Sequence, residues 1–159
     1  MPSAQAQDFA SRYTVAEVFS DGLTGAFAVI FEDKKSHVRT LAIRGTDVSL
    51  NTDWLSNAYL AIGIPPSLNP QFLALRPIIG DWIQSGLLPL GSDAVGHSLG
   101  GYLAAAVKAS FPATFVSAYT FNAPGFVEHP GGLPGVLQAI FGIPVPQLGV
   151  LDVRGTAGL

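Results

Sequence analysis

Residues 93–102, with the sequence DAVGHSLGGY, decide how this chain folds and what chemistry it can carry. An apolar run leads into a Gly-x-Ser-x-Gly turn, and Ala and Leu residues follow it. This order predicts a strand, a sharp turn and a helix, with Ser98 at the apex of the turn as a nucleophile. Glycines at positions 96 and 100 leave room for the backbones to close around it. Amide N–H groups at the start of the helix would then point at an oxyanion formed beside Ser98.

The composition describes one domain that is unusually apolar. The 159 residues are 48% hydrophobic and 12% charged, with a mean hydropathy of +0.40. The net charge is −3 and the eight Lys and Arg residues are scattered, so we expect no nucleic-acid partner. Without cysteine the chain has no disulfide, thiolate metal site or Cys nucleophile. No cluster of ligands calls for a metal or another cofactor.

Two membrane-related features are also not expected. No run of about 18 apolar residues occurs, so the sequence predicts no transmembrane segment. The opening residues MPSAQA have an Ala-x-Ala pattern, but no apolar stretch precedes it, so they are not an intact signal peptide.

Strand-like and helix-like segments alternate along the chain. Asn69 and Pro70 are typical of a helix start, and Pro77 should kink the helix that follows or split it in two. We expect a mainly parallel sheet flanked by helices and begun by an antiparallel hairpin, an α/β fold. Besides the run before Ser98, the expected strands are residues 13–19, 25–31, 37–44, 114–121 and 148–153, and the expected helices are residues 54–60, 71–84 and 102–109. Residues 1–12 are expected to be flexible, and residues 125–134 to be a flexible connection or a substrate-gating loop.

A serine that carries out acyl transfer needs a base, an acid and donors for the oxyanion. The first donor would be the N–H of Leu99, directly after Ser98. The second should come from a loop that follows an earlier strand, which a parallel sheet would bring beside the turn. Residues 44–47, RGTD, are the good candidate because they end a hydrophobic strand at a glycine.

Together these residues resemble a known family. The sequences LAIRGTD, DWLSN, GHSLGGYLAAA and YTFNAPG, in this order, are similar to class 3 lipases of the α/β-hydrolase superfamily, and more narrowly to bacterial lipases and phospholipases often joined to calcium-binding repeats. The resemblance runs from about Tyr13 to the C-terminus. It implies that Ser98 attacks an ester carbonyl, that Thr46 and Leu99 form the oxyanion hole, and that residues 57–70 act as a lid or lipid-facing surface. It also implies a lipid or other ester substrate, transient contact with a lipid surface and secretion.

The base is where the sequence departs from this family. Hydrolases of this fold carry Ser, then Asp or Glu, then His along the chain. His37 precedes Ser98 and opens a strand at a charged loop, where an exposed or capping role is expected. His97 adjoins Ser98, and adjacent side chains point apart, so its role should be structural. His129 is therefore the candidate base, although Glu128 is the one acidic residue between it and Ser98.

Asp152 is the candidate acid, at the end of an expected strand, with an ordinary strand-end role as the alternative. Asp53 is expected to cap a helix or to position the Thr46 loop. Because the base is poorly placed, the resemblance predicts that residues 1–159 are the front part of a lipase domain within a longer polypeptide. Three functions stay open: a lipase or phospholipase A type ester hydrolase, a catalytically incomplete piece that lacks its His base, and a lipid-binding module on a hydrolase scaffold.

Overall fold

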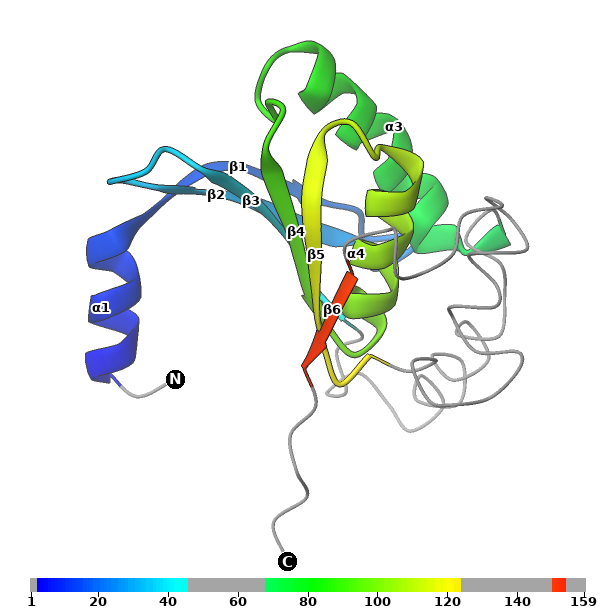
Figure 1. The fold of residues 1–159 in the computed structure, drawn as a ribbon. Coiled ribbons are helices and arrows are strands. Elements are labelled where there is room, and N and C mark those ends of the chain that lie inside the picture. Colours follow the sequence, from blue (N-terminus) through cyan, green and yellow to red (C-terminus); the bar gives the residue numbers. More distant parts are fainter. Residues whose placement is uncertain (1–2, 46–67, 124–149, 154–159) are drawn as a thin grey trace, which may run out of the picture.

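The computed structural model of the chain describes residues 3–45, 68–123 and 150–153, which build a mixed sheet with helices on both sides (Figure 1). The described residues form a six-stranded sheet in which the strands follow one another in chain order. The first pairings, β1 with β2 and β2 with β3, are antiparallel, and β3 to β6 run parallel. The predicted α/β fold with an antiparallel start is confirmed. The strands are β1 (Tyr13–Ser20), β2 (Phe27–Asp33), β3 (Arg39–Ile43), β4 (Ser92–His97), β5 (Phe115–Phe121) and β6 (Val150–Val153).

The core lies between the sheet and the helices α3 (Pro70–Gln84) and α4 (Leu99–Ser110), which cover the same face (Figure 1). Alternation along the strands turns every second residue toward these helices, as in the buried Ile30 of β2 and Leu41 of β3. Helix α4 is buried along almost its whole length, and its run of alanines lets the helix approach the sheet closely. The turn around Ser98 therefore joins a strand of this sheet to a helix that is buried against it.

Helix α3 begins where the sequence predicts. Asn69 caps it, since its side-chain oxygen accepts hydrogen bonds from the N–H groups of Gln71 and Phe72. Of the two outcomes expected at Pro77, the split is excluded, because α3 continues through this residue as one helix. Pro77 and Leu73 are both exposed, so water can hydrate the Leu73 carbonyl that loses its N–H partner.

Residues 3–12, within the segment predicted to be flexible, form helix α1 (Ser3–Arg12) on the other side of the sheet (Figure 1). None of its residues is buried. Its last turn is fixed to the β2–β3 hairpin by an ion pair of 2.8 Å between Arg12 Nε and Asp33 Oδ2. The flexibility of this segment stays a prediction. The expected helix at residues 54–60 and the expected loop at residues 125–134 lie outside the described residues.

Candidate active site

Ser98 occupies the single residue between β4 and α4, in a backbone conformation that L-residues rarely adopt. Its φ is 55° and its ψ is −129°, the angles of the first central residue of a type II′ turn, a position that favours glycine. Three backbone hydrogen bonds hold it there. The Ser98 N–H donates to the Phe121 carbonyl at 2.9 Å, and the Ser98 carbonyl accepts from the N–H groups of Gly101 at 2.9 Å and Tyr102 at 3.3 Å. The hydroxyl does not cap the helix, and the residue is partly exposed. The fold thus presents this serine on a strained, rigid turn.

Two glycines make this turn possible, and each for a steric reason. A Cβ on Gly96 would lie 2.1 Å from the Gly100 oxygen, so the strand and the helix could not close with a larger residue there. A Cβ on Gly100 would lie 2.3 Å from the Ile43 oxygen and 2.8 Å from the Gly45 nitrogen. The Gly-x-Ser-x-Gly spacing is therefore required by contacts within the turn and by contacts with the end of β3.

The oxyanion donors predicted from the sequence belong to two segments that meet at this turn. Leu99 is the first residue of α4, where backbone N–H groups have no partner within the helix. Gly45 touches the turn from the β3 side, since a Cβ on it would lie 2.5 Å from the His97 oxygen. Thr46 comes next in the chain but lies outside the described residues. The structure therefore brings the start of the RGTD loop beside Ser98.

The histidines in the described part of the chain are His37 and His97. His37 lies in the β2–β3 connection, at the opposite end of the parallel strands from Ser98. Its side chain is 75% exposed and its Nδ1 lies 3.0 Å from Glu32 Oε1, in keeping with the exposed role expected. His97 ends β4 and is exposed on the face of the sheet that Asp93 shares. His129, the candidate base, lies outside the described residues.

Asp152 lies in β6, where its backbone pairs with Thr120 of β5. Strand β6 is two strands from β4, and its last residue, Val153, pairs with Phe121, whose carbonyl receives the Ser98 N–H. Asp152 therefore lies near the same edge of the sheet as Ser98. The Asn122 N–H also donates to the Val153 carbonyl at 3.0 Å, which fixes the ends of β5 and β6 to each other.

Two kinds of feature are absent from the described residues. These residues hold no cluster of three His, Cys, Asp or Glu side chains suited to a metal ion. Helices α1, α3 and α4, the helices in the described ranges, are too short or too polar to cross a membrane.

The sequence reasoning missed a feature of the opposite sheet face, where Asp93 lies among aromatic side chains. The signal was present, because the strict alternation of β4 puts Asp93 and Val95 on one side and Ala94 on the other.

Comparison with solved structures assigns the fold. Lipase II from Rhizopus niveus matches with a TM-score of 0.51 and 17% identity over 94% of this chain and 60% of the lipase. The lipase of Rhizomucor miehei, in a propeptide complex, matches with a TM-score of 0.52 and 15% identity over 86% of this chain and 49% of that one. The chain therefore spans between half and three fifths of these lipases. No family model and no curated protein matches the sequence. The chain has the α/β-hydrolase fold in the form that lipases adopt.

Proposed function

We propose that this chain belongs to a serine carboxylic-ester hydrolase that acts on lipid esters, of the lipase or phospholipase A type. The observation that carries the proposal is the strained turn at Ser98 between β4 and α4, closed by Gly96 and Gly100. A side chain held at such a turn, at the carboxyl end of a parallel sheet and the start of a helix, has the geometry of a nucleophile elbow. The lipase-like fold supports the same reaction class.

In this proposal the Ser98 Oγ attacks the ester carbonyl carbon while His129 accepts the hydroxyl proton. The N–H of Leu99 and the Thr46 loop stabilise the oxyanion of the tetrahedral intermediate. Cleavage of the carbon–oxygen bond releases the alcohol, which takes the proton from His129, and water then hydrolyses the acyl-serine by the same steps. Asp152 orients the histidine. Gly45, in contact with the turn, supports the placing of the Thr46 loop beside Ser98.

A second candidate function is a lipid-binding piece that lacks its base. The positions of the two described histidines favour it, because His37 lies at the far end of the strands and His97 extends along the other face of the sheet. Without a base the Ser98 hydroxyl would keep its ordinary, weakly nucleophilic state.

Covalent labelling by a fluorophosphonate probe separates the two candidates. A hydrolase should be labelled efficiently, and Ser98→Ala should abolish both the labelling and the hydrolysis of long-chain p-nitrophenyl esters. Ser110→Ala is the matched control, because this hydroxyl lies at the other end of the same helix and bonds to the Ala106 carbonyl. Labelling that survives in Ser98→Ala would refute the proposed nucleophile. Absence of labelling in the unchanged chain would favour the lipid-binding piece.

The narrower parts of the proposal need other substrates. Hydrolysis of phosphatidylcholine vesicles at a rate near that of triacylglycerol emulsions would support the phospholipase type, and hydrolysis of short soluble esters alone would favour an esterase. Membership in the bacterial class 3 group, secretion, and transient contact with a lipid surface at residues 57–70 belong to the same proposal.

A further inference from the structure

The sheet face that is turned away from α3 and α4 carries an aromatic trough. The trough has a volume of about 370 Å³, and Phe9 of helix α1 borders one end of it. Its other end reaches Phe121, the residue whose backbone carbonyl holds the Ser98 N–H. Besides Phe121, the residues that line the trough include Phe9, Tyr13, Phe31, Thr40, Asp93 and Tyr119.

The strand register explains the hollow shape. Phe31 of β2, Thr40 of β3 and Asp93 of β4 stand in one row across the sheet. Adjacent strands lie about 4.8 Å apart, so Phe31 and Asp93 flank the small Thr40 side chain at a backbone separation of about 10 Å. In the next row Ala42 is again small, and Tyr119 stands two strands away from β3. Small residues on β3 thus form a floor between larger side chains on the strands beside it.

Asp93 is the charged side chain among the described residues that line this trough. Burial raises the pKa of its carboxyl group, and a hydrogen bond from the Ser117 N–H opposes that rise. A cation in the trough would stabilise the ionised carboxylate, whereas a fatty-acid carboxylate would be repelled. A purely apolar occupant would exclude water from the Asp93 carboxylate and would supply neither a hydrogen bond nor an opposite charge in its place.

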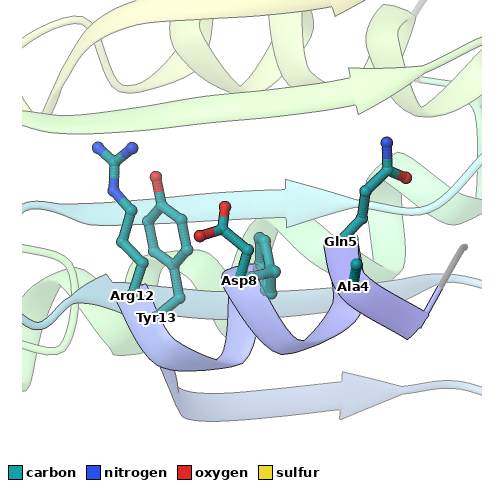
Figure 2. Close-up of a pocket in the computed structure, with 6 residues that line it drawn as sticks. Ala4, Gln5, Asp8, Arg12 and Tyr13 are labelled. Carbon is teal, nitrogen blue, oxygen red and sulfur yellow. The ribbon is translucent and has the colours of Figure 1, made fainter.

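Aromatic rings at both ends of this face already hold cations of the chain itself. The Arg12 guanidinium lies 5.1 Å from the centre of the Tyr13 ring, and that of Arg44 lies 4.7 Å from the centre of the Phe27 ring. A hollow of about 480 Å³ along α1 shares Tyr13 with the trough, and Figure 2 shows Asp8 and Arg12 projecting from the same side of that helix. The Arg12–Tyr13 and Arg44–Phe27 contacts both fall within the distance at which a cation and an aromatic ring attract each other.

We propose that the trough binds an organic ammonium ion, with the quaternary ammonium group of choline as the type ligand. The cation would lie over Thr40, with the Asp93 carboxylate on one side and the Phe31 ring on the other. Phe9, which packs edge-on against Phe31 with ring centres 5.1 Å apart, closes the aromatic wall from α1. Ring faces attract a quaternary ammonium without hydrogen bonds, and the carboxylate supplies the opposite charge.

Titration calorimetry with choline chloride tests this on the full chain, with 3,3-dimethylbutan-1-ol as the neutral ligand of the same shape. We expect saturable binding of choline and at least about tenfold weaker binding of the neutral alcohol. Asp93→Asn should weaken choline binding by about tenfold and Phe31→Leu by about threefold to tenfold, and neither should affect the neutral alcohol comparably. Asp81→Asn, an exposed carboxylate on α3, is the matched control and should change nothing.

Circular dichroism of each variant distinguishes a folding defect from a loss of choline binding. Equal affinities for choline and the neutral alcohol, or choline binding unchanged in Asp93→Asn, would overturn the proposal in favour of a plain apolar groove. Absence of saturable binding would overturn it as well, as would sedimentation showing a dimer that choline does not disturb. Choline binding should persist in Ser98→Ala, so this proposal and the proposed hydrolysis of lipid esters can fail separately.

Discussion

The backbone strain at Ser98 leads to a prediction about two variants that both remove the proposed nucleophile. Ser98→Gly should be more stable than Ser98→Ala. A non-glycine residue at φ 55° and ψ −129° costs about 1–3 kcal/mol, a cost that glycine does not carry. Glycine also loses about 0.5–1 kcal/mol more conformational entropy on folding. The free energy of unfolding should therefore rise by about 0.5–2 kcal/mol relative to Ser98→Ala, which keeps the Cβ and so keeps the strain. Urea unfolding followed by circular dichroism measures this difference, provided that both variants share one m-value.

At Ser110, in the last turn of α4, glycine should change the free energy of unfolding in the opposite direction. Ser110 has helical geometry, so Ser110→Gly should have a free energy of unfolding about 0.5–1 kcal/mol lower than that of Ser110→Ala. A Ser98→Gly variant that is no more stable than Ser98→Ala would show that the turn stores no strain. The structural case for a nucleophile elbow would then fail together with this prediction.

Three other changes test the turn at Ser98, the contact that fixes α1 and the cap of α3. Gly96→Ala should lower the free energy of unfolding by about 3 kcal/mol or prevent folding, because its Cβ would lie 2.1 Å from backbone, whereas Gly22→Ala, with no atom within 4 Å, should be near neutral in the same urea titration. The pKa of Asp33 is held well below its ordinary value by the hydrogen bond from Arg12, so this carboxylate stabilises the chain fully above about pH 4 and loses that effect as the pH falls below it; Asp33→Asn should flatten the fall of the urea midpoint between about pH 4 and pH 2. Asn69→Ala removes the cap of α3 and should cost about 1–2 kcal/mol, measured as a lower unfolding midpoint.

Local patterns predicted most of the sheet. Apolar runs predicted β2 and β3, and the glycine spacing predicted the turn at Ser98. Helix α4, however, begins at Leu99 rather than at the expected residue 102, because packing against the sheet outweighs the low helix propensity of Gly100 and Gly101.

Helix α1 could not be predicted by the same means. Its sequence, SAQAQDFASR, holds one large apolar residue, Phe9, and none of its residues is buried. A helix that packs through a single aromatic side chain, here Phe9 against Phe31, gives too few apolar positions to reveal a helical period. The contacts that position it, such as the ion pair between Arg12 and Asp33, join residues far apart in the chain and follow no local rule.

In the candidate site, too, some features depend on local geometry and others on contacts between distant segments. Ser98 and Leu99 are fixed by a turn whose geometry is local, so a ten-residue pattern was enough to find them. Their pairing with the RGTD loop depends instead on two long-range approaches, Gly100 against the Ile43 carbonyl and Gly45 against the His97 carbonyl. These are contacts between backbone atoms that only glycine permits, so a larger residue at either position would separate the end of β3 from the start of α4. Leu99, one of the two proposed oxyanion donors, opens α4, and the chain that leads to the other passes through Gly45. The close approach of these two segments therefore depends on a pair of glycines.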